Sequence, residues 1–170
     1  WQTMCRGGFC THGETFHRED EVLWWAKGGK LYGESAPRIA FLRELLESLP
    51  GEWKPIRRRI GNPNADLSDP AEAESEKKFK EMMERFPQDI QEGFYAQTPL
   101  QIESGQFRLL YLGHACPSRM HMQLPDDGSW KVELIDVWNM TRNLLIEGVK
   151  GNICLGLPAK EGMALLAVKE

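Results

Sequence analysis

The sequence has 170 residues, of which 41% are hydrophobic and 27% charged, and its formal net charge at pH 7 is −4. This composition is typical of a globular protein and argues against a disordered chain; the small negative charge argues against nucleic-acid binding, which needs Lys and Arg concentrated on one face. No run of eighteen apolar residues is present, so we expect no membrane partner.

Along the chain, the first feature is a short run of apolar and small residues that predicts a strand buried on both faces: Met4, Gly8, Phe9 and Cys10. A group of polar side chains follows directly: Thr11, His12, Glu14, Thr15 and His17. In βα-repeat proteins, side chains just beyond the carboxyl end of a strand face the ligand. The segment therefore predicts a strand, a functional loop and then a helix.

The predicted helix begins near Ser35-Ala36-Pro37, because Ser caps exposed amides and Pro is tolerated in a first helical turn. Its apolar residues recur at spacings of three and four: Ile39, Leu42, Leu45, Leu46 and Leu49. Pro50-Gly51 ends the helix. One strand and one helix cannot bury their own apolar surfaces, so we expect their neighbours upstream or in another chain.

Three blocks in this region resemble, in order, the end of the barrel in apiosidase-like glycoside hydrolases. They are Trp1-Gln2-Thr3-Met4-Cys5-x-Gly7-Gly8-Phe9-x-Thr11-His12-Gly13-Glu14-Thr15, Asp20-Glu21-Val22-Leu23-Trp24-Trp25-x-Lys27-Gly28-Gly29 and Gly33-Glu34-Ser35-x-x-Arg38-Ile39-Ala40-Phe41-Leu42. Those enzymes are (β/α)8 barrels followed by a small C-terminal β-sandwich. The resemblance implies that residues 1–50 are the C-terminal end of a TIM-barrel catalytic domain.

Residues 51–92 are predicted to be a linker that contains a helix. The stretch up to residue 70 is rich in proline and poor in aliphatic residues, which is typical of an extended connection. Asp69-Pro70 then opens a helical stretch from Ala71 to Arg85, and Pro87 ends it. The charges of this stretch alternate in sign, as on a solvated helix face.

Residues 93–170 are predicted to form an antiparallel β-sandwich, because short β-rich runs alternate with turn signals such as Pro125-Asp126-Asp127-Gly128. The runs are Phe94–Thr98, Gln106–Leu112, Arg119–Leu124, Trp130–Trp138, Asn143–Glu147, Asn152–Leu157 and Met163–Val168. This part also resembles the collagen-binding-like sandwich appended to the same hydrolase family. The predicted fold class is therefore α/β plus all-β: the last βα unit of a (β/α)8 barrel, a linker helix and a β-sandwich.

The catalytic residues that the resemblance implies are a pair of carboxylates on earlier strands of the barrel, upstream of this chain. Glycoside hydrolysis needs one carboxyl group as acid and another as nucleophile or base. Glu14 is a weak candidate for a catalytic role and a better one for binding the substrate, and it could instead cap a turn or pair with Arg6 or Arg18. The predicted substrate-binding residues are Thr11, His12, Glu14, His17 and Trp25.

Several of these residues have structural alternatives. His12 and His17 could donate to sugar hydroxyls or be ordinary structural histidines. One indole of Trp24-Trp25 could stack on a sugar ring while the other is core. Asp136, which lies between Ile135 and Val137, is expected to hold a turn or satisfy a buried backbone group and not to catalyse.

We predict no metal and no cofactor. The spacing of Cys5, Cys10, His12 and His17 is not a usual zinc pattern, and small buried hydrophobes are an alternative interpretation of the two cysteines. The glycine pairs lack a P-loop or GxGxxG context. No GxSxG motif is present.

The sequence thus predicts a C-terminal fragment of a glycoside hydrolase that acts on plant-type polysaccharide or oligosaccharide. Its partners would be a carbohydrate substrate and the remainder of the barrel, upstream or in another chain, and the fragment alone would be inactive. The alternatives are a non-catalytic carbohydrate- or protein-binding sandwich and an independent domain of unrelated role. An exposed row of aromatic side chains on one sheet would favour the binding module, whereas burial of Trp130 and Trp138 in the core would favour a structural sandwich. Localisation stays open between bacterial cytoplasm and secretion, because any signal would precede the chain.

Overall fold

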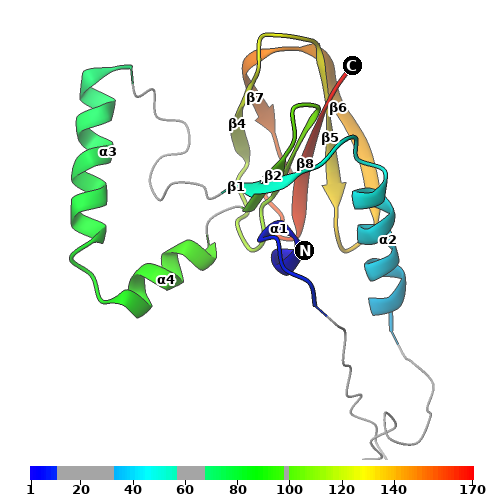
Figure 1. Ribbon diagram of the computed structural model, residues 1–170, viewed down its shortest axis with the longest axis horizontal. Helices are drawn as coiled ribbons and strands as arrows, with labels where there is room; N and C mark the ends of the chain where they lie inside the picture. The colour runs from blue at the N-terminus through cyan, green and yellow to red at the C-terminus, as the bar shows by residue number, and fades with distance from the viewer. Residues whose placement is uncertain (11–32, 57–67, 98–99) are drawn as a thin grey trace, which may run out of the picture.

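The computed structural model describes residues 1–10, 33–56, 68–97 and 100–170 (Figure 1). Four helices are described: α1 Gln2–Cys5, α2 Ser35–Glu47, α3 Pro70–Met83 and α4 Gln88–Gln97. Eight strands are described: β1 Lys54–Ile56, β2 Leu100–Glu103, β3 Phe107–Tyr111, β4 Arg119–Leu124, β5 Trp130–Asp136, β6 Thr141–Val149, β7 Gly151–Gly156 and β8 Met163–Lys169. No described helix has both the length and the apolar character that crossing a membrane requires.

The strands form two antiparallel sheets. The larger sheet has the order β1-β2-β3-β8-β5-β6, and the smaller one pairs β4 with β7. In β8, Leu165 lies opposite Leu110 and Leu134, whereas the next residue, Leu166, lies opposite Leu109 and Glu133. Since neighbouring residues of a strand point to opposite faces, these registers assign each row of side chains to one face of the large sheet.

Each face of the large sheet carries its own apolar cluster. One face packs against the small sheet, where Met120 and Leu155 meet Leu165 and the fully buried Trp130. The other face is covered by α1 and α2, which contribute Cys5 and Leu45 to a cluster with Leu109. Because β8 is central and covered on both sides, its sequence is an uninterrupted apolar run and not an alternating one.

The predicted fold class is wrong in its first part. Residues 4–10, expected to be a strand, contain the last turn of α1 and irregular chain, and the described residues hold no remnant of a (β/α)8 barrel. Arg6 interrupts the apolar run, and Gly7 has a φ of +78°, which is not a strand conformation. Of residues 4–10, Cys5 is the one that is buried. The described residues are mainly β-strand and resemble a small β-sandwich, in which α1 and α2 cover one face of the large antiparallel sheet.

The other predicted elements agree with the structure to different degrees. The linker helix is confirmed as α3, whose N-terminus is capped by the Asp69 carboxylate accepting from the Ala71 amide at 2.8 Å. Arg119–Leu124 is confirmed as β4. The predicted strand at Phe94–Thr98 is wrong, since α4 runs to Gln97, and the short strands β1 and β2 were not expected. β1 is an edge strand, which tolerates Pro55.

The predicted domain boundaries at residues 50 and 92 stay a prediction. Leu45, from the first predicted domain, packs with Ile102 and Leu109 from the third. β1, from the predicted linker, pairs with β2 and extends the large sheet. Within the described residues, segments 1–50, 51–92 and 93–170 therefore all supply either a strand of the large sheet or a side chain packed on one of its faces.

Candidate functional site

The residues predicted from the sequence to bind substrate lie outside the described part of the chain. They are Thr11, His12, Glu14, His17 and Trp25, and their roles remain predictions. The candidate site described below is built instead from the turn between β5 and β6, the turn before β8 and the first turn of α2. These segments are far apart in sequence and meet at one end of the large sheet.

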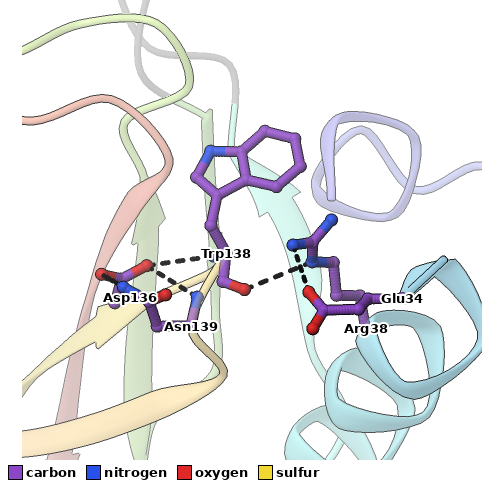
Figure 2. Close-up of polar contacts among 5 residues, drawn as sticks. All are labelled: Glu34, Arg38, Asp136, Trp138 and Asn139. Atoms are coloured by element: carbon purple, nitrogen blue, oxygen red, sulfur yellow. Dashed lines mark hydrogen bonds and ion pairs between the residues drawn. The ribbon is translucent and has the colours of Figure 1, made fainter.

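The β5–β6 turn is organised by the Asp136 carboxylate (Figure 2). Its Oδ1 accepts from the backbone amides of Trp138 and Asn139, each at 3.0 Å. Its Oδ2 accepts from the Asn139 side-chain amide at 2.8 Å and from Lys160 Nζ at 2.6 Å. The turn-holding role expected for Asp136 is confirmed.

The ionisation of Asp136 suits this structural role. Burial raises the pKa of Asp136, but hydrogen bonds from Lys160 and Asn139, together with the charge of Lys160, outweigh burial and hold that pKa below its ordinary value. A carboxylate that stays ionised and receives four hydrogen bonds is poorly suited to act as a general acid. We therefore assign no catalytic role to it.

Arg38 joins α2 to this turn (Figure 2). Its Nε donates to the backbone carbonyl of Trp138 at 3.2 Å, and a terminal nitrogen donates to the Glu34 carboxylate at 2.7 Å. The guanidinium carbon lies 4.9 Å from the centroid of the Trp138 ring, which is within the range of a cation–π contact. One cationic side chain thus holds both the backbone and the ring of Trp138.

Gly162 supports the edge of the same indole. A Cβ placed on Gly162 would lie 2.3 Å from Trp138 Nε1 and 2.4 Å from Cδ1, so no other residue type fits without moving the ring. Gly162 is itself tied down, because its amide donates to the Gly113 carbonyl at 2.8 Å and its carbonyl accepts from Val137 at 2.9 Å. Trp138 is nevertheless 46% exposed, whereas Trp130 at the other end of β5 is 1% exposed.

The ionisable side chains of these segments have partners. Arg38 pairs with Glu34, Lys160 with Asp136, and His114 Nδ1 lies 3.1 Å from the carboxylate of Glu161, which precedes Gly162. The described residues contain no group of three or more His, Cys, Asp or Glu side chains able to hold a metal. What the arrangement offers chemically is a fixed aromatic surface with polar neighbours.

The two cysteines at the start of the chain differ in burial: Cys5 is buried and Cys10 is exposed. Cys5 is buried under the large sheet, and burial raises its pKa to about 11, which keeps it a neutral thiol. The interpretation of Cys5 as a small buried hydrophobe is therefore confirmed. Cys10 is exposed, so that interpretation is wrong for Cys10.

The sequence assigned none of these residues to a site, although it singled out two of them. Trp138 was recognised as a residue whose exposure matters, and Asp136 as a turn residue. Arg38, Lys160 and Gly162 were missed as members of a site. The Asp136-x-Trp138-Asn139 spacing is a detectable signal, because Asp favours turns that bond its side chain to amides two and three residues later. No local signal links Arg38 to a residue one hundred positions away.

Comparison with known proteins found one matching family model and similar folds within longer solved chains. Residues 97–167 match a domain of unknown function, DUF5605, which is less than half of the chain. Curated proteins gave no significant match. The fold is similar to a solved structure from Bacteroides vulgatus ATCC 8482 that is provisionally named a glycoside hydrolase, with 22% identity and a TM-score of 0.59 over 96% of this chain and 29% of that one.

A second solved structure, named a glycoside hydrolase, is similar over 78% of this chain and 25% of its own length, with 10% identity and a TM-score of 0.50. The chain thus spans less than a third of either solved chain. At these identities the likeness establishes a shared fold. It leaves the narrower resemblance to apiosidase-like enzymes as a prediction.

Proposed function

We propose that this chain is a non-catalytic β-sandwich part of a glycoside hydrolase that acts on plant-type polysaccharide or oligosaccharide. The observation that carries the proposal is a structural similarity to a solved protein that is provisionally named a glycoside hydrolase. The similarity covers 96% of this chain but only 29% of the solved chain. The catalytic carboxylate pair would lie outside this chain, and the partner of the chain would be the remainder of the enzyme, in the same polypeptide or another.

The described carboxylates around Trp138 support the non-catalytic part of the proposal. Hydrolysis of a glycosidic bond requires one carboxyl group that carries a proton near neutral pH and a second, free carboxylate across the substrate. Glu34, Asp136 and Glu161 are each engaged with a basic side chain, and the pKa of Asp136 is lowered, not raised.

Within the glycoside hydrolases, the motif blocks of residues 1–42 lead us to infer the apiosidase-like type. Glu14, His12 and Trp25 would contact the sugar beside a catalytic pair supplied from elsewhere, and Thr11 and His17 would contribute hydrogen bonds. These roles rest on the sequence alone.

The test compares the native protein, purified from its source, with the 170-residue chain. Intact mass gives the length of the native polypeptide, and both proteins are assayed on a panel of plant oligosaccharides by reducing-sugar release. We expect hydrolysis by the native protein and none by the 170-residue chain. Hydrolysis by the short chain, or none by a native protein that is folded and longer, contradicts the proposal.

A matched pair of variants in the native protein tests the role of Glu14. We expect Glu14→Gln to raise KM with a smaller effect on kcat, because it removes a substrate contact and not the acid or nucleophile. Glu44→Gln on α2 changes the same charge on an exposed helix face and should leave both parameters unchanged. Complete loss of kcat in Glu14→Gln would instead make Glu14 catalytic.

A second candidate function is a non-catalytic carbohydrate-binding module that works without an attached hydrolase. The observation that favours it is the exposed and fixed ring of Trp138. The two candidates differ in the native protein, since only the first predicts hydrolysis.

A further inference from the structure

We propose that the exposed indole of Trp138 is a stacking platform for a ring of a neutral glycan. The site consists of Trp138, Asn139 and Lys160, with Arg38 and Gly162 fixing the ring. The glycan class rests on the proposed function, whereas the location and the neutral charge follow from the structure.

The first argument is that the ring is exposed and yet fixed in place. Leaving about half of a tryptophan in water forgoes roughly 1 kcal/mol of burial free energy. A solvent-exposed ring usually has several rotamers, but Arg38 contacts this ring and Gly162 supports its edge. A ring that is oriented before the ligand arrives loses less entropy on binding.

The second argument is backbone strain. Among the described residues, two that are not glycine have a positive φ: Met140 at 55° and Ala159 at 50°. Met140 follows Trp138 by two positions, and Ala159 precedes Lys160, so both lie in the turns that hold the ring. Each conformation costs about 1–2 kcal/mol, and such strain is concentrated at binding sites.

The third argument concerns the class of ligand. Within the turns at residues 137–140 and 158–162, Trp138 is the one large hydrophobic side chain that is exposed, and its exposed neighbours are polar, as Asn139, Lys160 and Glu161 show. A protein-binding hot spot is usually surrounded by further contacts that exclude water. One aromatic ring with polar neighbours matches a sugar ring, which presents an apolar C–H face and a rim of hydroxyl groups.

The fourth argument concerns the charge of that sugar. The two basic side chains of the site, Arg38 and Lys160, already face Glu34 and Asp136. A uronic acid would have to compete with a carboxylate for each of these cations. A neutral sugar needs only hydrogen bonds, so neutral glycans are favoured over acidic ones.

The test is isothermal titration calorimetry of the full 170-residue chain with neutral xylan-, arabinan- and galactan-derived oligosaccharides and with oligogalacturonate. We expect binding of at least one neutral series, and weaker or no binding of oligogalacturonate. Trp138→Ala should weaken that binding about tenfold or more, and Trp138→Tyr should largely retain it, because a ring remains. Phe86→Ala, which removes another exposed aromatic side chain (41% exposed), is the matched control and should bind as the wild type does.

Three results would overturn the inference: no binding of any neutral oligosaccharide, unchanged binding by a folded Trp138→Ala variant, or a change in oligomeric state in Trp138→Ala, which would make the ring a protein contact. If Trp138→Ala fails to fold, Trp138→Leu replaces it, since Leu retains apolar bulk without a flat ring. Hydrolysis by the native protein is measured separately. Trp138-dependent binding without hydrolysis therefore rejects the proposed function alone, and hydrolysis without binding rejects this inference alone.

Discussion

The two ends of β5 place a tryptophan in opposite environments. Trp130 begins the strand and is buried between the two sheets, where its Nε1 has no hydrogen-bond partner among the described residues. Trp138 lies two residues beyond the other end, where a carboxylate, a guanidinium and a glycine hold it at the surface. The same residue type contributes to stability at one end and presents a surface at the other, so its chemistry alone does not reveal its role.

The largest expected effect comes from truncating the buried ring. Trp130→Ala should lower the free energy of unfolding by about 3–5 kcal/mol, because it leaves a cavity between Val132 and the small sheet. Trp138→Ala should cost about 1 kcal/mol or less, since half of that side chain is already in water. Urea denaturation followed by circular dichroism measures both. Equal losses of unfolding free energy in the two variants would contradict the difference in burial between Trp130 and Trp138.

Asp136→Ala should have the next largest effect, about 2–4 kcal/mol, because it removes four hydrogen bonds and leaves Lys160 without its partner. Asp136→Asn, which keeps an acceptor for the turn amides, should cost less. Urea denaturation gives both losses, and the shift in total tryptophan emission should be larger in the alanine variant. A loss in Asp136→Ala no larger than that in Asp136→Asn would mean that the turn does not depend on these bonds.

The same carboxylate predicts a dependence on pH. The folded-state pKa of Asp136 is below its ordinary value of 3.8, so its contribution is fully present above the ordinary range and is lost as the pH falls through the folded-state pKa. The difference in unfolding free energy between wild type and Asp136→Asn should therefore be constant from pH 7 to about pH 5 and should shrink below about pH 4. Urea titrations at four pH values measure it. A difference that grows on acidification would reverse the assigned sign.

Gly162→Ala tests the support under the exposed ring. Its φ of +71° disfavours a side chain, and the new Cβ would overlap the indole, so we expect a loss of about 2 kcal/mol and a shift in tryptophan emission. Gly148→Ala is the matched control, because Gly148 has a φ of +70° with open space around it, and should cost about 1 kcal/mol without a shift. Equal effects of the two variants would mean that backbone strain alone, and not the ring, explains the loss at Gly162.

The smallest expected effect is that of Arg38→Ala, about 0.5–1 kcal/mol, from the lost cation–π contact and the bond to the Trp138 carbonyl. Thermal denaturation and tryptophan emission measure it. Arg43→Ala, on the same helix with a comparable pair to Glu47, should leave both the stability and the emission unchanged. An emission shift in Arg43→Ala equal to that in Arg38→Ala would remove the special role of Arg38.

Local patterns predicted several elements well. The strand predicted at Arg119–Leu124 agrees with β4, in which the buried residues Met120, Met122 and Leu124 alternate with exposed polar residues. Asp69-Pro70 likewise predicted the start of α3. The strand expected near residue 4 was wrong, because a short apolar run is ambiguous between helix and strand when its buried positions are few.

What the sequence by itself determined was the set of local elements with a clear period or cap and the turn at Asp136, because these depend on neighbours within a few residues. What only the tertiary structure decided was which surface each helix covers and which tryptophan is buried. Arg38 and Trp138 are one hundred positions apart, and the register of β5 against β8 and the packing of α2 on the sheet bring them together. Such contacts depend on how the chain packs as a whole, and no short stretch of sequence encodes them.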